Sequence, residues 1–434
     1  MSYSAIITTL TDVRKHPNAD KIQLATCQGY QVVVGLDAQE GDEVILFPDD
    51  GQLSAEYAAF NNLIGYTDAA GVRQGGYFDK HRRVRAQTFR GEKSEAYVAP
   101  LSSLGFTGFP EEMLVSGLLV NELAGIPICA KYVNPHTKQA QRPLTGVHKV
   151  RQDLKKLFPE HTDTEQLRFA RPGSLIGLVT LTAKCHGTSA RSGLVKIPVE
   201  QPQTWWQKLL RRKPQMLAQW QSVYGTRRVI KGEAEAGSSD YRQVCHNTLA
   251  PHILKGEIWY YEIVGFEDSG ASIMPSAGTD KMPKDFQKRF GKTMTYTYGC
   301  LPGQCAIYVY RIAVMGEDGA RYELPWALVK ERCRTAGIEH VPEIGSVLVK
   351  GEEHERTVYD AVEHFTEEVD LADPIDARHI REGVCVRIDC TDTGKMKTYK
   401  NKTFAFKVLE GIVKDSGVVD TEEAEDVEEE LGAA

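Results

Sequence analysis

The segment from Leu178 to Arg191 constrains the fold and chemistry of this chain more than any other. Apolar and polar residues alternate from Leu178 to Ala183, which predicts a half-buried β-strand that delivers Lys184 to a turn. Gly187 in that turn allows a phosphate to approach the backbone. Three further side chains can donate hydrogen bonds to an anion: Thr188, Ser189 and Arg191. Lys184 is therefore a candidate nucleophile, although a lysine in an ordinary surface turn has the same local pattern.

Length and composition predict a multi-domain protein of the cytoplasm. A chain of 434 residues is long enough for two or three domains with proper cores. No apolar run approaches the ~20 residues that a membrane span needs, and the N-terminal sequence lacks the layout of a signal peptide. We therefore expect a cytoplasmic protein that has no membrane partner.

The net charge of −7 arises at one end of the chain. Residues 415–434 contain nine acidic residues and no basic one, which leaves 50 acidic against 52 basic residues elsewhere. We expect this acidic tail to be disordered. The nearly neutral remainder can still carry local basic surfaces for a polyanion.

The cysteines predict neither a disulfide framework nor a zinc site. There are nine of them, scattered along the chain without a Cys-x-x-Cys pair. Cys185 lies inside the segment described first, but a catalytic cysteine needs a placed base, and Lys184 explains the pattern better.

Residues 1–130 are rich in short β-like runs separated by turn residues, which predicts a small barrel or sandwich. The clearest runs are Ser4–Leu10, Gln31–Gly35 and Glu43–Phe47. Between the first two, His16–Lys21 reads His-Pro-Asn-Ala-Asp-Lys and resembles a segment of OB-folds that bind tRNA. In isolation, the same residues are a turn between strands.

A basic run with interleaved aromatic residues follows at 75–91. Cations that pair with phosphates and rings that stack on bases are typical of a groove for RNA. The alternative is a solvated strand face. The candidate nucleic-acid-binding residues of this run are Arg82, Arg83, Arg85 and Arg90.

Two further segments interrupt the chain. Residues 131–166 are polar and contain several prolines, so we expect a linker with a short helix near Val150–Leu157. The insert at 203–220 has three tryptophans, a basic run and apolar residues at rough helical spacing. It predicts an amphipathic helix packed on its own domain or, alternatively, a guide for nucleic acid.

Four strand-like or basic stretches accompany Lys184 in the second half of the chain. Two of them place a carboxylate in an apolar β-run, Glu262 in Ile258–Phe266 and Glu382 in Arg381–Ile388. A carboxylate in such a run is costly unless it is paired or binds a metal. The other two are the aromatic run Ala306–Ile312 and the basic run Lys397–Phe404.

This ordered set resembles the covalent nucleotidyltransferase superfamily of RNA ligases, DNA ligases and mRNA capping enzymes, over roughly residues 167–410. The segment Lys184–Ser189 is similar to its motif I, in the Lys-x-His-Gly form of some RNA ligases. The later motifs are matched in order by Glu262–Gly265, Ile307–Ile312, Glu382–Val384 and Lys400–Lys402.

The order of the domains resembles the Deinococcus-type RNA ligases, in which an OB domain precedes the transferase domain. The segment Phe89–Glu95 is also similar to that group. DNA ligases and capping enzymes instead carry an OB domain after the last motif, where this chain has a short acidic tail.

The resemblance implies an RNA ligase that uses ATP and Mg²⁺ or Mn²⁺ in three phosphoryl-transfer steps. Lys184 attacks the α-phosphate of ATP to form lysyl-AMP, AMP passes to an RNA 5′-phosphate, and a 3′-hydroxyl displaces AMP. Because only neutral lysine is a nucleophile, its pKa should fall from about 10.4 to about 7. We expect burial and nearby cations, including Lys400 and Lys402, to lower it.

The resemblance also implies roles for individual residues. Glu382 holds the metal, Glu262 contacts the ribose hydroxyls or a metal, and Tyr310 stacks on adenine with Tyr308 as the alternative. Lys400 and Lys402 bind the phosphates. Arg227 or Arg228 binds the AMP or the RNA 5′-phosphate, and the sequence leaves the choice open. The remaining candidates for the nucleotide site are His186, in the place of a commoner aspartate, with Gly187 and Arg191.

The predicted fold class is therefore α+β. An OB-like barrel (1–130) and a linker (131–166) precede an ATP-grasp-like nucleotidyltransferase domain of antiparallel sheets plus helices (167–414), and the acidic tail (415–434) follows. We expect a monomer that seals nicks in RNA or RNA-containing duplexes. The alternatives are an RNA-binding protein with a decayed transferase domain and an mRNA capping guanylyltransferase.

Overall fold

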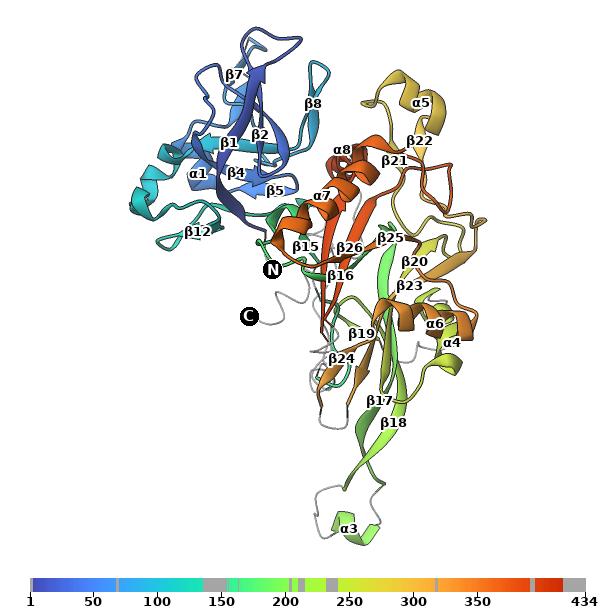
Figure 1. Cartoon of the computed structure of the whole chain (residues 1–434). Coiled ribbons are helices and arrows are strands. Elements are labelled where there is room, and N and C mark those ends of the chain that lie inside the picture. Colours follow the sequence, from blue (N-terminus) through green and yellow to red (C-terminus); the bar gives the residue numbers. More distant parts are fainter. Residues whose placement is uncertain are drawn as a thin grey trace. The chain divides into compact units, whose positions relative to one another are not determined.

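The computed structural model describes residues 3–67, 70–135, 154, 156–162, 164–202, 205–209, 215–231, 241–316, 319–390 and 395–416. Its fold is α+β and rich in strands, as predicted (Figure 1). The chain forms two compact units. The first comprises the described residues up to Asn134 together with Thr403–Ser416, and the second those from Pro135 to Lys402. Within these ranges no helix is long and apolar enough to cross a membrane.

Short strands build the first unit, in the region where the sequence predicts a barrel. The main sheet has the order β10-β4-β1-β2-β3, with β11 also paired to β1. Its strands are β1 (Ala5–Lys15), β2 (Gln23–Cys27), β3 (Tyr30–Val34), β4 (Glu43–Pro48), β10 (Ala96–Pro100) and β11 (Leu119–Val120).

The two ends of this sheet approach each other. The Glu95 amide, next to β10, donates to the Gln31 carbonyl of β3 at 3.0 Å. The Gln31 side chain in turn donates to the Lys93 carbonyl at 2.9 Å. Smaller pairs complete the unit: β5 (Gly51–Leu53) with β14 (Cys129–Lys131), β6 (Gly65–Thr67) with β7 (Arg73–Gly75), β8 (Gln87–Phe89) with β9 (Glu92–Ser94), and β12 (Glu122–Leu123) with β13 (Ile126–Pro127), besides the helix α1 (Ala55–Phe60).

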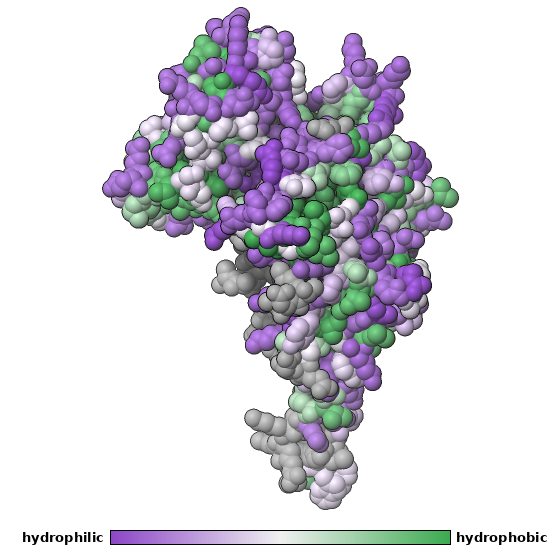
Figure 2. All heavy atoms as spheres, viewed as in Figure 1, coloured by the Kyte–Doolittle hydropathy of each residue, from purple (hydrophilic) through white to green (hydrophobic). Residues whose placement is uncertain are grey.

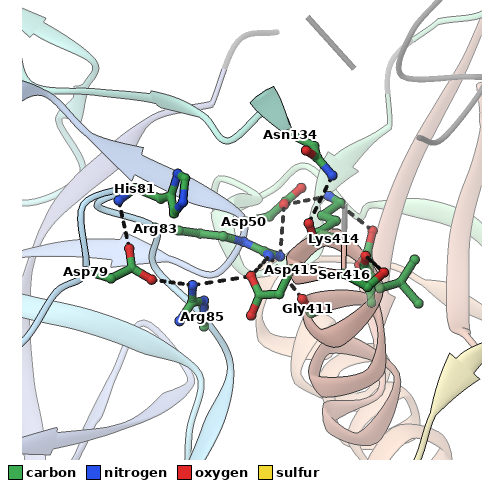
Figure 3. A network of polar contacts seen from close by, with 12 residues as sticks. Asp50, Asp79, His81, Arg83, Arg85, Asn134, Gly411, Lys414, Asp415 and Ser416 are labelled. Atoms are coloured by element: carbon green, nitrogen blue, oxygen red, sulfur yellow. Dashed lines mark hydrogen bonds and ion pairs between the residues drawn. The ribbon is translucent and has the colours of Figure 1, made fainter. Parts of the chain in front are cut away.

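The C-terminal helix α8 (Phe404–Asp415) belongs to the first unit, not to the transferase domain as predicted. Lys407 is buried and its Nζ lies 3.0 Å from Glu95 Oε1. Figure 3 shows the neighbouring contacts, in which Lys414 Nζ lies 2.6 Å from Asp50 Oδ1 and Arg83 Nη1 3.0 Å from Asp415 Oδ1. Buried ions are costly without partners, so these pairs fix α8 on this unit.

The second unit is built on two largely antiparallel sheets, and the chain passes between them from β16 to β17 and again from β24 to β25. The five-stranded sheet has the order β15-β27-β26-β16-β25, in which only β15 runs parallel to its neighbour. Its central strands bury Val179, Leu181, Val384 and Val386. The strands are β15 (Glu165–Gln166), β16 (Gly177–Lys184), β25 (Glu343–Val349), β26 (Gly383–Cys390) and β27 (Lys395–Lys402).

The six-stranded sheet has the order β19-β18-β17-β20-β23-β24. The bounds are β17 (Thr188–Glu200), β18 (Met216–Thr226), β19 (Ile230–Lys231), β20 (Glu257–Gly265), β23 (Cys305–Met315) and β24 (Arg321–Glu323). The remaining elements of the unit are α3 (Trp205–Leu209), α4 (Tyr241–Leu249), α5 (Lys284–Phe290), α6 (Trp326–Ala336), α7 (Glu355–Glu363) and the pair β21 (Ala277–Gly278) with β22 (Thr293–Met294).

The strands predicted around the candidate site are confirmed, with one shift: Glu382 precedes β26 rather than lying on it. The helix predicted over 203–220 is wrong. Of the described residues in this segment, those of α3 alone are helical, and from Met216 the chain is a strand that pairs with β17 residue by residue. The expected helix near Val150–Leu157 and the tail beyond residue 416 fall largely outside the described residues.

Candidate active site

Strand register brings three predicted residues to one end of the five-stranded sheet. Lys184, the last residue of β16, lies opposite Gly383, the first residue of β26. Gly383 also lies opposite Lys402, the last residue of β27. A side chain at Gly383 would place its Cβ 2.1 Å from the Asn401 carbonyl oxygen, so only glycine permits this approach. Lys184, Glu382 and Lys402 therefore meet at this end of the sheet.

A buried carboxylate bridges the two lysines. Glu382 Oε1 lies 2.8 Å from Lys184 Nζ and 3.5 Å from Lys402 Nζ. The Glu382 side chain is only 3% exposed, and its other oxygen, Oε2, is buried without a hydrogen-bond partner among the described residues. Burial would raise the pKa of the Glu382 carboxyl, but the charges of Lys184 and Lys402 outweigh burial and lower it.

The pKa of Lys184 is opposite in direction to the one that the sequence suggests. Burial disfavours its charged form, as expected, but the adjacent Glu382 carboxylate outweighs burial and raises the pKa above its ordinary value. Lys184 is thus held as a charged ammonium in this structure. The neighbouring Cys185 is buried, which raises the pKa of its thiol, so it is no reactive nucleophile.

The turn after Lys184 joins the two sheets, and Glu262 of β20 holds it. The Gly187 amide donates to Glu262 Oε1 at 3.2 Å, and Ser189 Oγ donates to Oε2 at 3.3 Å. A Cβ on Gly187 would lie 2.3 Å from the Ile263 carbonyl oxygen. Gly187 is therefore required for close packing against β20, a reason that differs from the phosphate approach expected from the sequence.

Sequence reasoning missed a second support of this turn. The His186 amide donates to the buried Tyr298 hydroxyl at 2.6 Å, and the Tyr296 ring meets the His186 ring edge-on at 4.5 Å. Behind the turn, Arg242 of α4 donates to Thr188 Oγ1 at 3.0 Å. Tyr298 comes from a loop without regular pattern, and no sequence signal connects it to His186.

Replacing Tyr298 by phenylalanine should lower both stability and any reaction at Lys184. The ring would remain, but the partly buried His186 amide would lose its acceptor, at a cost of about 1–3 kcal/mol. We expect a lower denaturation midpoint and a roughly 10-fold slower reaction, because the loosened turn no longer fixes Lys184. Tyr322→Phe, at an exposed position, is the matched control. An unchanged rate in Tyr298→Phe would show that the hydroxyl does not position the turn.

Arg191 is completely buried on β17, where the sequence expects a ligand contact. Its Nη2 donates to the Arg228 carbonyl at 3.1 Å, and its guanidinium lies 4.7 Å from the centre of the Phe158 ring. Nε and Nη1 are buried without hydrogen-bond partners in the described part of the chain. Burial lowers the pKa of Arg191 to about 10. Arg227 and Arg228 lie in the turn from β18 to β19. A hydrogen bond that the Thr226 amide donates to the Val229 carbonyl closes this turn.

The two candidate tyrosines on β23 differ in position. Tyr308 lies opposite Glu262 across the strand pair, and burial raises the pKa of Tyr308 to about 12. Tyr310 lies at the bulge in this pairing, between Val309 and Arg311, contacts the ring of His161 at 5.5 Å and packs on the core around Phe158. Lys400 lies on β27, opposite Cys385.

In the first unit, the predicted RNA-binding arginines have unequal surroundings. Arg83 is buried in the ion pairs of Figure 3, and Arg85 pairs with Asp79 at 2.7 Å, so neither is placed as a surface phosphate contact. Arg82 is half-buried and donates to the Leu53 carbonyl, whereas Arg90 is exposed. The buried His16 accepts from the Asn18 amide and contacts the Phe89 carbonyl, so it ties its turn to β8.

The described residues contain no group of three or more His, Cys, Asp or Glu side chains that could hold a metal ion. Glu382 is the carboxylate beside Lys184, and its Oε2, which accepts no hydrogen bond from the described residues, lies 3.9 Å from His186 Nδ1. A metal at this place would need further ligands from water or a bound phosphate, which is the usual manner of Mg²⁺.

No family model and no curated protein matches the chain. Solved structures do match over nearly its whole length, among them several of Naegleria gruberi RNA ligase. A mutant with ATP and Mn has a TM-score of 0.56 and 15% identity over 94% of this chain and 98% of that chain. The ligase with PPi and a second mutant with AMP and Mn each have a TM-score of 0.56 and 15% identity over 93% of this chain and 97% of theirs. This likeness establishes a shared fold.

Proposed function

We propose that this protein is an ATP-dependent RNA ligase, in which the Lys184 amine attacks the α-phosphate of ATP, releases pyrophosphate and forms a lysyl-AMP. The observation that carries the proposal is the meeting of Lys184, Glu382 and Lys402 within 3.5 Å at the junction of two sheets. The fold is shared with an RNA ligase whose structures contain ATP, AMP or PPi, several of them with Mn. A nucleophile, an acidic residue and a second cation on that fold suit transfer of a nucleotidyl group.

Glu382 keeps Lys184 protonated until the substrate is bound. Oε2 of Glu382, which accepts no hydrogen bond from the described residues, suits a divalent cation, Mg²⁺ or Mn²⁺, with phosphate and water as its other ligands. Such a cation would neutralise phosphate charge and compete with Lys184 for the carboxylate. Without that carboxylate, burial favours the neutral amine, and the pKa of Lys184 falls toward the range that a nucleophile needs.

The other groups would bind the nucleotide. Lys402 and Lys400 face the phosphates from β27, and the unpartnered donors of Arg191 suit an anion or a carbonyl of the ligand. Glu262, next to Gly187, would accept from the ribose hydroxyls or contact a metal. Tyr308 is now the better candidate for stacking on adenine than Tyr310, because it lies directly opposite Glu262. Arg227 or Arg228 would bind the AMP or the RNA 5′-phosphate.

The remaining steps join RNA ends, as in the reaction expected from the sequence. AMP passes from Lys184 to a 5′-phosphate, and a 3′-hydroxyl displaces it, at nicks in RNA or RNA-containing duplexes. The strand order of the first unit and its closure from β3 to β10 support an OB-type domain that holds RNA. Arg90 is its exposed candidate contact. We expect the ligase to act as a monomer in the cytoplasm.

Incubation with α-labelled ATP and Mg²⁺ tests the proposal directly. We expect acid-stable label on the protein, transfer of the label to a 5′-phosphorylated nicked RNA duplex, and a sealed product. Absence of label would overturn the ligase and favour an RNA-binding protein with an inactive transferase domain. Label from GTP but not from ATP would instead identify a guanylyltransferase.

A further inference from the structure

The hairpin of β17 and β18 extends beyond the sheet that contains the candidate active site. β17 pairs with β20 only from Thr188 to Gly193, but with β18 over its full length from Ala190 to Glu200. The outer half of the hairpin is therefore a two-stranded ribbon, with α3 at its far end (Figure 1). No residue of this outer half takes part in the site around Lys184.

The outer ribbon exposes large apolar side chains. Every residue of β18 from Met216 to Ser222 is exposed, whereas Tyr224–Thr226 are buried. Of the five tryptophans, Trp259 and Trp326 are buried, and the other three are exposed here. Figure 2 shows pale and green side chains at the surface of this hairpin's end. The exposed apolar residues are Trp205 (64%), Trp206 (57%), Leu209 (66%), Met216 (52%), Leu217 (49%) and Trp220 (38%). Apolar patches of this kind mark interaction sites.

Cations flank the tryptophan on one face of the ribbon. Lys196 lies directly opposite Trp220 across the strand pair, and its side chain is exposed. Lys255 Nζ lies 5.9 Å from the centre of the Trp220 ring. Between Val195 and Trp220 the sequence has five basic residues and a single acidic one, in a chain with a net charge of −7. An exposed aromatic ring with one lysine opposite it and a second lysine over it matches a strand of nucleic acid, whose bases stack and whose phosphates pair with cations.

We propose that the platform of Lys196, Trp220 and Lys255 binds an unpaired stretch of the RNA substrate. This inference rests on the proposed ligase function and adds a second RNA contact to it. Ser189, which lies opposite Glu262, precedes Lys196 by seven residues on β17. At about 3.3 Å per strand residue, the platform is roughly 23 Å from that end of the site. An RNA strand must therefore run about seven stacked nucleotides from the reacting ends to reach Trp220.

Two fluorescein-labelled RNA hairpins test the platform by fluorescence anisotropy. One has a blunt stem, and the other has the same stem with an unpaired extension of about ten nucleotides. We expect the extension to tighten binding to the wild-type protein. Trp220→Ala should weaken binding of the extended RNA about 10-fold and leave the blunt RNA unaffected, while Trp220→Phe should keep most of the affinity because phenylalanine still stacks. Lys196→Ala should lower the salt dependence of binding of the extended RNA by about one counterion.

Leu217→Ala is the matched control, because Leu217 is exposed on the opposite face of the same strand. Equal losses with both RNAs, or no loss with either, would overturn the platform. Binding of phosphatidylserine vesicles through Trp220, without an effect on RNA, would assign the patch to a lipid surface instead. Because anisotropy needs no catalysis, the result is independent of lysyl-AMP formation, whose absence would contradict only the proposed ligase activity.

Discussion

Replacing Lys184 by arginine is expected to slow transfer of AMP to the protein by about 10³-fold or more. Arginine keeps the positive charge that faces Glu382 and so preserves the ion pair at 2.8 Å. Its guanidinium stays protonated in proteins and offers no free electron pair to the α-phosphate. The measurement is acid-stable label on the protein after a timed incubation with α-labelled ATP and Mg²⁺.

Lys397→Arg is the matched control for this substitution. Lys397 is an exposed residue of β27, the strand that carries Lys402 at its end. The control should label at the wild-type rate, and both variants should unfold at the wild-type temperature. Alanine at position 184 would be a weaker test, since it removes one of the two lysines that balance the buried Glu382 charge. Comparable labelling of Lys184→Arg would place the covalent attachment on another residue.

The sequence predicted the strands of the candidate site because their patterns are local. Alternation of apolar residues over Leu178–Ala183 corresponds to β16, and the apolar run around Glu262 corresponds to β20. Lys184 and Lys402 lie at the ends of their strands, and Glu382 directly precedes β26. Lys184 lies about 200 residues before Glu382 and Lys402 in the sequence, and the register of β16, β26 and β27 brings the three together.

Elsewhere the structure depends on long-range pairing, which could not be predicted from the sequence. The spacing of Trp, Leu and Met residues in 203–220 favours a helix, but eleven cross-strand pairs with β17 make the segment from Met216 a strand. The membership of α8 in the first unit depends on Lys407 meeting Glu95 and on Lys414 meeting Asp50, partners more than 300 residues away. Periodicity carries no information about such partners. A truncation that removes residues 1–130 would therefore leave these buried lysines of α8 without their carboxylate partners.

At the candidate site, the contacts of Tyr298 and Arg242 likewise could not be predicted from the sequence. Each supports the turn after Lys184 from a segment that has no motif of its own. The sequence also could not predict whether the pKa of Lys184 is raised or lowered, because the shift depends on whether Glu382 faces a metal or the lysine itself. In this structure the carboxylate faces the lysine, and this contact leads to the second large expected effect.

Replacing Glu382 by glutamine should lower the pKa of Lys184 and yet slow its reaction with ATP. The amide carries no charge, so burial, which disfavours the ammonium form, is no longer outweighed. Lys184 should then become neutral at a lower pH than in the wild-type protein. Adenylylation should nevertheless fall by about 100-fold or more, because the oxygen proposed to hold the metal is lost. If Glu382 had only a structural role, its replacement would not lower the pKa of Lys184 while also slowing adenylylation.

Acetylation by acetic anhydride across a pH series, read at each lysine by mass spectrometry, measures the first quantity. The midpoint for Lys184 should move to lower pH in Glu382→Gln, while the exposed Lys397 should be acetylated to the same extent in both proteins and serves as the internal reference. Glu339→Gln, at an exposed carboxylate, should change neither the midpoint nor the rate of labelling from ATP. A midpoint for Lys184 that stays in place or rises would contradict control of this lysine by Glu382. A lowered midpoint together with wild-type labelling would instead show that Glu382 sets the charge of the nucleophile without binding the metal.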